Sequence, residues 1–247
     1  GAAVRPGNIL VGASGIGSTS LSSTGNSTID FTGGTVSITS SGAAISIGAG
    51  VDISSTAFDD TQNLGMEIVA TNGNINLDGS LSAKQLNVTA VNSGNINIGG
   101  DIIAPMASLT VQGSSSINQT GEGTIGIGTL VLSSQSGNIG SSLRPLETNV
   151  LEIMATSGGS VYLNNAASVD VKTSTVAGTF QLNNAGDISI ESKVLAGNLD
   201  FTADGDISIF NGVDGSNGVA LSTGDGNALS VAAGIDLASS KGSLTLN

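Results

Sequence analysis

The sequence contains no cysteine, no histidine and no tryptophan, and it has only three prolines and a single tyrosine, Tyr162. Without cysteine, the chain has neither a disulfide framework nor a thiolate metal site. Without histidine or cysteine, it has neither a Ser-His-Asp nor a Cys-His nucleophilic arrangement. These absences remove the commonest catalytic constellations, and we expect a protein that is not an enzyme.

Positive charge is scarce as well. Six Lys and Arg residues stand against 19 Asp and Glu residues, which gives a formal net charge of −13. The basic residues are scattered singly, whereas phosphate contacts need clustered Lys and Arg, so we expect no nucleic acid partner. No apolar run is long enough for a transmembrane helix, and residues 1–20 lack the basic and apolar regions of a signal peptide. Because the chain begins at Gly1 without Met, we expect a processed product or a segment of a longer chain.

Small residues make up most of the chain. Hydrophobic residues account for 38% of the sequence, but aromatic residues account for only 2%, so the core must be narrow and filled by branched aliphatic side chains. Charged residues are only 10%, which leaves Ser, Thr and Asn to cover the surface. This composition is typical of an extracellular bacterial polymer rather than of a cytosolic enzyme. It is nearly uniform along the chain, so residues 1–247 are expected to form a single domain.

A repeat of about 22 residues runs through the sequence. A Gly, or a Ser in its place, precedes a short β-like run, as in GNINL at Gly73 and GDISI at Gly186. Two residues later comes a β-branched aliphatic residue in each of seven repeats. These residues are Ile75, Ile96, Ile117, Ile139, Val161, Ile188 and Ile207.

A second series of apolar residues at positions i and i+2 accompanies the first, for example Leu86 with Val88 and Leu199 with Phe201. This alternation predicts strands with one buried face, each too short to be stable alone, which therefore stack on their equivalents. The pattern predicts an all-β fold: a single-stranded, right-handed parallel β-helix with three short strands per coil and about eleven coils. Residues 1–60 carry similar runs, such as STIDF and VDISS, whose register the pattern does not fix.

The pattern G-[ND]-I-x-[IL], a loose middle strand and then L-x-[LVIF]-x-A resembles the central repeats of filamentous haemagglutinin-like exoproteins. The resemblance extends from about Ile29 to Asn247 and is best between Met66 and Phe210. It implies a β-helical shaft at the cell surface of a bacterium, exported through an outer-membrane secretion partner. It also implies a role in adhesion, aggregation or biofilm formation, with host cells, neighbouring cells or glycans as partners.

Three aspartates are candidate calcium ligands. Asp187 and Asp206 hold equivalent places in two repeats, and Asp204 stands on the other side of the Gly205 turn from Asp206. Carboxylate oxygens suit this hard cation. In the alternative interpretation these residues replace Asn in turns, as Asn74, Asn95 and Asn138 occupy the matching place elsewhere.

Two repeats are longer than the others. The excess falls in residues 164–179 and 211–227, and extra residues in a solenoid are expected to leave the coil as loops that form a binding face. Asp214, Asn217 and Asp225 in the second segment are therefore candidate binding residues. The alternative is a tolerated insertion without a role.

Three functions fit the sequence. The first is the shaft of a secreted adhesin or filament. The second is a self-assembling fibre whose subunits stack end to end, or associate laterally, through unpaired edge strands. The third, which the lack of a carboxylate cluster disfavours, is an enzyme that acts on polysaccharides.

Overall fold

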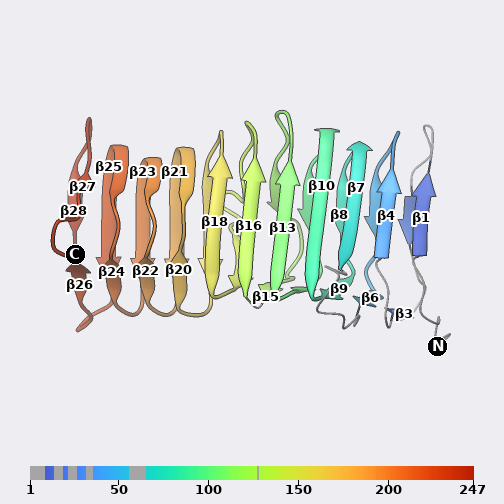
Figure 1. Ribbon diagram of the computed structural model, residues 1–247, viewed down its shortest axis with the longest axis horizontal. Helices are drawn as coiled ribbons and strands as arrows, with labels where there is room; N and C mark the ends of the chain where they lie inside the picture. The colour runs from blue at the N-terminus through green and yellow to red at the C-terminus, as the bar shows by residue number, and fades with distance from the viewer. Residues whose placement is uncertain (1–8, 14–18, 22–26, 32–35, 56–64, 127) are drawn as a thin grey trace.

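The computed structural model describes residues 9–13, 19–21, 27–31, 36–55, 65–126 and 128–247. These residues form a parallel β-solenoid whose coils are stacked along one axis, from the N-terminus to the C-terminus in Figure 1. The all-β class and the parallel stacking that the sequence predicts are confirmed. In the described part of the chain there is no helix, and hence none that is long and apolar enough to cross a membrane.

The solenoid has about nine turns rather than the expected eleven. Coil length also varies along the chain, and Ile190 pairs with Ile209 after only 19 positions. Val36 pairs with Met66, 30 positions further along the chain, whereas Leu86 pairs with Ala107 after 21.

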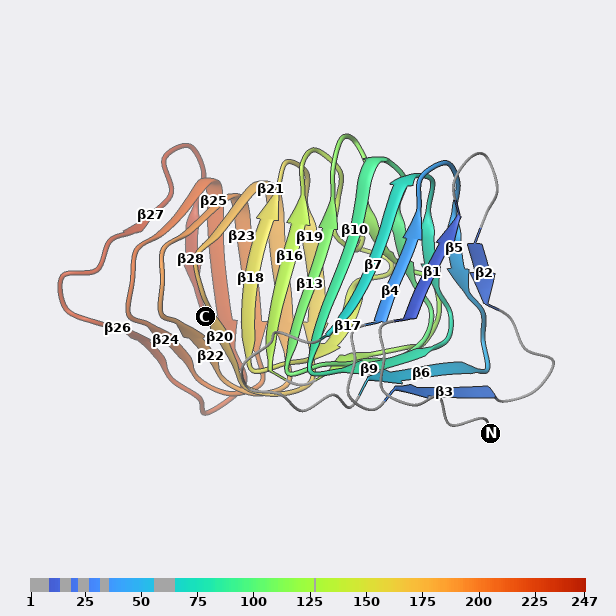
Figure 2. The same cartoon turned by 45° about the vertical axis from the view of Figure 1, so that its right-hand side comes forward.

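Up to residue 157 each coil has three sides. The first side is formed by the longer strands, which are β1 (Ile9–Ala13), β4 (Val36–Ser40), β7 (Met66–Asn72), β10 (Gln85–Ser93), β13 (Met106–Val111), β16 (Thr129–Ser134) and β18 (Glu152–Ser157). The second side consists of β2 (Thr19–Leu21), β5 (Ile45–Ile47), β8 (Ile75–Leu77), β11 (Ile96–Ile98) and β14 (Ile117–Gln119). The third side consists of β3 (Ser27–Phe31), β6 (Val51–Ser55), β9 (Ser80–Ala83), β12 (Ile102–Ile103), β15 (Ile125–Gly126) and β17 (Leu146–Asn149). Figure 2 shows β3, β6 and β9 running across the base of the coils.

The strands after residue 160 have a different arrangement. Between residues 169 and 231, short strands alternate with long ones that bend in the middle, and the chain ends in short strands. They are β19 (Val161–Asn165), β20 (Val169–Val171), β21 (Ser174–Asn184), β22 (Ile188–Ile190), β23 (Val194–Ala203), β24 (Ile207–Ile209), β25 (Val213–Thr223), β26 (Leu229–Val231), β27 (Leu237–Ala238) and β28 (Leu244–Leu246). The bend is a shift of register, for example between Val176 and Thr179 in β21.

The coil changes its cross-section between these two halves. The first part of β18 pairs with β20, through Ile153 and Val171, and its second part pairs with β21, through Ser157 and Val176. The first side of the solenoid therefore divides into two. At the same level β19 combines the second and third sides, because Val161 pairs with Ile139 and Leu163 pairs with Leu146.

This change corrects the predicted ladder of β-branched residues. The ladder is confirmed from Ile75 to Val161, where each residue pairs with its equivalent in the next coil. The expected step from Val161 to Ile188 is wrong, because Val161 pairs with Phe180 and Ile188 pairs with Val169. The two similar motifs belong to different sides of the coil.

The core is one continuous column of inward-facing hydrophobic side chains from Val36 to Leu221, and nearly all of them are aliphatic. Its strands show strict alternation of buried and more exposed residues, as in β8, β11 and β22. The alternation that the sequence shows is therefore the alternation between core and surface. The small outward residues leave the surface available for hydrogen bonds between coils.

Candidate functional site

Side chains link the turns of successive coils by accepting hydrogen bonds from backbone N–H groups. The N–H of Asn95 donates to Asn74 Oδ1 at 2.8 Å, and the N–H of Ser116 donates to Asn95 Oδ1 at the same distance. The N–H of Ser160 donates to Asn138 Oδ1 at 2.8 Å. These contacts pair backbone donors that are left over where each strand begins. The Asn of the Gly-Asn motif is thus a coil-to-coil connector.

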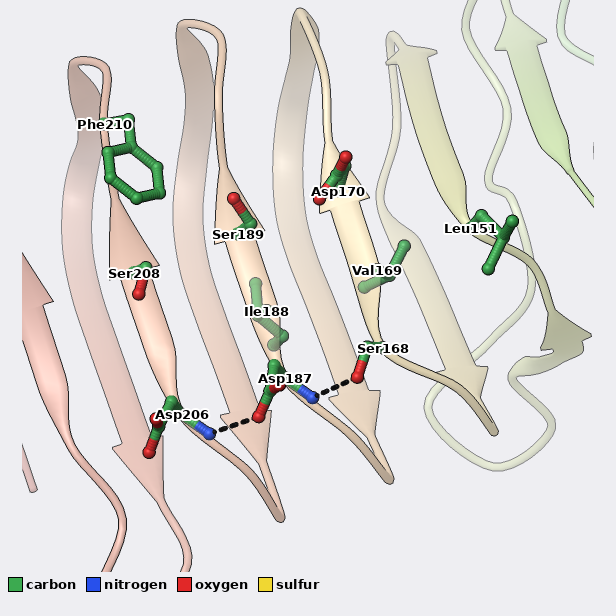
Figure 3. A pocket seen from close by; sticks show the side chains of 10 residues that line it. All are labelled: Leu151, Ser168, Val169, Asp170, Asp187, Ile188, Ser189, Asp206, Ser208 and Phe210. Carbon is green, nitrogen blue, oxygen red and sulfur yellow. Dashed lines mark hydrogen bonds between the residues drawn. The ribbon is translucent and has the colours of Figure 1, made fainter.

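Asp187 and Asp206 do the same on the side formed by β20, β22 and β24. The N–H of Asp206 donates to Asp187 Oδ1 at 2.8 Å, and the N–H of Ala228 donates to Asp206 Oδ1 at 2.8 Å. The N–H of Asp187 donates to Ser168 Oγ at 3.0 Å. Figure 3 shows Ser168, Asp187 and Asp206 in one row. The two aspartates, which hold equivalent places in the repeats, therefore lie in adjacent coils, and their geometry is that of the Asn connectors.

The third calcium candidate, Asp204, lies apart from the other two. Its N–H donates to the Asn184 carbonyl at 2.8 Å, and it lines a different hollow, beside Asn184 and Thr202. Within the described ranges no three Asp, Glu, His or Cys side chains come together as a metal-binding group. Calcium takes about six to eight oxygen ligands, so these aspartates alone do not form such a site.

A groove of about 410 Å³ lies on the outer face of β20, β22 and β24, and we name it the β22 groove. Its floor carries the outward residues of these strands, Asp170, Ser189 and Ser208. Asp187 and Asp206 form one wall. Two large apolar side chains mark its ends, Leu151 with 60% of its surface exposed and Phe210 with 55% (Figure 3).

Beside the groove, Lys172 is held by three carboxylates from successive coils. Its Nζ lies 3.5 Å from Glu152 Oε1 and 3.5 Å from Asp170 Oδ2, and it donates a hydrogen bond to Glu191 Oε2. That hydrogen bond raises the pKa of Lys172 against the opposing effect of burial, and the negative charges of Asp170, Glu191 and Glu152 raise it further. The lysine therefore stays charged and is fully engaged in pairing.

The two longer repeats do not form the expected loops. In the first segment, residues 164–179, the chain enters β20 and β21, and in the second, residues 211–227, it forms β25. Val169, Val171 and Val176 point into the core, and so do Val213 and Val219. The prediction of protruding flaps is wrong, because the additional residues build the sides of the solenoid after its change of cross-section.

The three candidate binding residues of the second segment are spread over the surface. Asp214 and Asn217 lie within β25, and Asp225 lies in the turn that follows it. Asp214 faces a hollow of about 440 Å³ beside Lys193 and Asp236. Its Oδ1 atom is buried and makes no hydrogen bond with any residue that the structure describes. The structure does not bring the three together in one site.

Sequence reasoning missed Ser189, Phe210 and Lys172. A signal for Phe210 was present, since Ile207 and Ile209 point inward and the next residue must then point outward. A large aromatic residue in that place is unusual, because Phe180 and Phe201 are both fully buried. The cluster around Lys172 had no such signal, since Glu152 and Glu191 come close to it only after the cross-section changes.

Comparison with protein family models, with curated proteins and with solved structures found no significant match. The assignment of the fold therefore rests on the strand pairing and core of the structure itself. The resemblance to filamentous haemagglutinin-like exoproteins stays an expectation from the repeats.

Proposed function

We propose that this chain is a structural shaft of a secreted bacterial adhesin or filament, displayed at the cell surface. The observation that carries the proposal is the unbroken core from Val36 to Leu221, whose coils are joined by parallel strands on every side. Such a stack is stiff in one dimension, and its stability increases with each coil that is added. A rod of this kind suits the display of a distant binding element.

The outer surface supports the same role. Outward Asn side chains on the second side form a ladder, in which Asn97 Nδ2 donates to Asn76 Oδ1 at 2.7 Å and Asn118 Nδ2 donates to Asn97 Oδ1 at 2.9 Å. These polar groups satisfy each other along the axis and leave few free groups for a ligand. That surface stiffens the rod, which favours a structural role for this part of the chain.

The position in the cell can be tested with antibodies raised against the 247-residue chain. We expect them to label intact cells of the bacterium that produces it, and we expect the label to disappear when its secretion partner is deleted. Labelling that requires permeabilised cells would overturn the proposal of a surface shaft.

The structural role can be tested by removing one complete coil. Deleting residues 75–95 joins Asn74 to Ile96, which takes the place of Ile75 because the two residues pair in register. A shaft tolerates this deletion, and adhesion or aggregation of cells should persist. Loss of adhesion with an intact fold and normal surface labelling would show that this coil is itself the binding element.

A self-assembling fibre is the second candidate. β28 pairs with β25 on one edge, and Leu244 and Leu246 are each 46% exposed. That uncovered edge accepts another coil, either from a continuation of the chain or from a second copy. A fibre requires the 247-residue chain alone to form end-to-end polymers, and electron microscopy with Leu244→Lys and Leu246→Lys as blocking variants distinguishes the two accounts.

A further inference from the structure

The dipeptide Asn-Gly occurs three times in the sequence, at Asn72, Asn211 and Asn217. In such a pair the backbone nitrogen of the glycine can attack Cγ of the asparagine side chain. Glycine has no Cβ atom, which leaves this nitrogen accessible and its backbone free to rotate. In a folded chain the reaction depends on how these two groups are placed, and the three pairs differ in this respect.

Asn211 lies in the bend between β24 and β25, near the C-terminal end of the stack in Figure 1, and it is exposed. The N–H of Gly212 donates a hydrogen bond to Asn211 Oδ1 at 2.8 Å. Because Cγ is one carbonyl bond of about 1.2 Å from Oδ1, it lies within about 4 Å of the Gly212 nitrogen. The attacking nitrogen therefore already faces the amide group that it would attack.

No neighbouring coil holds the Gly212 nitrogen in place. Among the described residues its N–H donates only to Asn211, whereas the Gly212 carbonyl accepts from the N–H of Val194 at 3.1 Å. The side-chain amide of Asn211 is held only weakly, because Nδ2 lies 3.5 Å from the Glu191 carbonyl oxygen. Ring closure at this pair therefore breaks no close hydrogen bond between coils.

Asn72 has the opposite arrangement. The N–H of Gly73 donates to the Ser93 carbonyl in the next coil at 2.7 Å. The Asn72 side chain is engaged as well, since Nδ2 donates to the Ser41 carbonyl at 2.9 Å and Oδ1 accepts from Asn92 Nδ2 at 3.2 Å. The nitrogen and the amide of this pair are therefore both fixed by contacts with neighbouring coils.

Asn217 lies inside β25, which pairs with β23 on one side and with β28 on the other. Gly218 is in register with Asn198 of β23. On the other side Gly242 is so near that a Cβ atom on it would lie 1.4 Å from the Asn217 carbonyl oxygen. The two neighbouring coils thus restrict the backbone rotation that ring closure requires.

We propose that Asn211 is a site of spontaneous deamidation, at which the chain converts itself to isoaspartate. The Gly212 nitrogen forms a bond to Cγ, and its proton passes through solvent to Nδ2. The bond from Cγ to Nδ2 breaks, and Nδ2 leaves as ammonia. Water then opens the resulting succinimide ring at either carbonyl group, which gives aspartate or isoaspartate. This inference goes beyond the proposed shaft and does not depend on it.

Isoaspartate at this position changes the structure in two ways. It adds one carbon to the main chain directly before Gly212, whose carbonyl accepts the hydrogen bond from Val194 of the neighbouring coil. The new carboxylate also adds negative charge beside a hollow that Asp214 and Asp236 line together with Lys193. We expect the contact between β23 and β25 to loosen there, so that the rod weakens at one defined coil as it ages.

The test follows deamidation in the purified 247-residue chain during incubation at mildly alkaline pH. Mass spectrometry of proteolytic fragments detects the exchange of the amide for a carboxyl group, localises it and distinguishes isoaspartate from aspartate. In the folded chain Asn211 should react at least about a hundredfold faster than Asn72, since misplacing reacting groups by about 1 Å has an effect of this size. Asn217 should also react more slowly than Asn211. After denaturation in urea, all three should react at similar rates.

Gly212→Ala is the matched variant. Outside its chain neighbours, a Cβ atom at this position would meet nothing closer than the Asp236 carbonyl oxygen at 3.8 Å, so thermal unfolding should be unchanged. Deamidation at Asn211 should be slower by about tenfold, because the methyl group hinders the attacking nitrogen and restricts its backbone. An unchanged rate in this variant, or equal rates at Asn72 and Asn211 in the folded chain, would overturn the proposal.

Hydrogen exchange tests the consequence for the fold. The N–H of Val194 should lose protection in the aged chain, because its acceptor on Gly212 is displaced. Freshly prepared Asn211→Asp carries the same charge without the additional carbon, and it should keep that protection. Equal loss in Asn211→Asp would overturn the role of the lengthened main chain, and full protection in the aged chain would overturn the loosening.

Discussion

Phe180 and Phe201 stack in successive coils with their ring centroids 4.9 Å apart and their ring planes at 86°, an edge-to-face contact inside the core. Both rings are fully buried, and Leu199 and Leu182 lie opposite them in the paired strands. The pair fills the solenoid just after its change of cross-section. There the aliphatic column of the first half is interrupted by two bulky rings.

Replacing Phe201 with Ala should destabilise the chain by about 3–5 kcal/mol, because the change leaves a cavity and removes the ring contact. Since each coil contacts chiefly its neighbours, the loss should be local. Hydrogen exchange should show weaker protection in β21, β23 and β25 than in β7, β10 and β13. Phe210→Ala is the control, and its free energy of unfolding should change by no more than about 0.5 kcal/mol because that ring is exposed. Uniform loss of protection along the rod would contradict local stacking.

Gly94 is required by its backbone conformation and by its contact with the preceding coil. Its φ is 136°, and a Cβ atom there would lie 1.9 Å from the Gly73 carbonyl oxygen. Gly94→Ala should therefore cost about 1–3 kcal/mol in chemical denaturation. Gly126→Ala is the matched control, since the nearest atom to its Cβ would be the Ile102 carbonyl oxygen at 3.9 Å. Equal stability of the two variants would show that the turn at Gly94 can relax.

Because of the ion pairs of Lys172, the free energy of unfolding of the chain should decrease at strongly alkaline pH. The pKa of Lys172 is raised in the folded chain from its ordinary value of 10.5, chiefly by the hydrogen bond to Glu191. The contribution of Lys172 to the free energy of unfolding is therefore fully present below pH 10.5 and is lost as the pH rises through the raised pKa. At neutral pH, Lys172→Met should cost on the order of 1 kcal/mol or less, because the partners are partly exposed.

The measurement for Lys172 is the melting temperature of the original chain and of Lys172→Met between neutral and strongly alkaline pH. Their difference should shrink as the lysine deprotonates. Lys241→Met serves as the control, because this exposed lysine is in no ion pair within the described residues. A difference that is constant over the whole pH range would mean that packing, not charge, explains the effect.

Asn97 in the outward Asn ladder should contribute to stability both as a hydrogen-bond donor to Asn76 and as an acceptor from Asn118. Asn97→Asp keeps the acceptor for Asn118 but places a carboxylate, which cannot donate, against Asn76 Oδ1. We expect a loss of about 1 kcal/mol in thermal unfolding. Asn87→Asp provides the comparison, because Asn87 is exposed on β10 and makes no side-chain hydrogen bond in the described part of the chain. A similar loss in both variants would attribute the effect to added negative charge.

Most of the fold was predictable because two periodicities coincide in the sequence. Alternation sets which residues face inward, and the Gly-Asn turns set the length of a coil, so Ile75, Ile96 and Ile117 fall into one ladder. The change of cross-section was not predictable from these signals. The motifs around Val161 and Ile188 look alike, and only the partners of Val169 show that they belong to different sides.

The site was predictable only in part, for a related reason. Equivalent positions in neighbouring repeats identified the row of Asp187 and Asp206. The groove beside it depends on residues that the repeat does not constrain, since Ser189 and Phe210 occupy outward positions where most small or polar residues are tolerated. Pairing of Lys172 with Glu152 depends on strand order, which local sequence does not encode.

The change of cross-section between β17 and β20 also limits where repeats can be added to the solenoid during evolution. Duplication of a whole repeat within either half adds a coil whose sides match both neighbours. Recombination between a repeat from the first half and one from the second would place a long strand against a bend, with unmatched backbone groups at the join. Lengthening by repeat exchange is therefore permitted inside each half and blocked across the boundary. The position of that boundary should persist while the number of coils on either side varies.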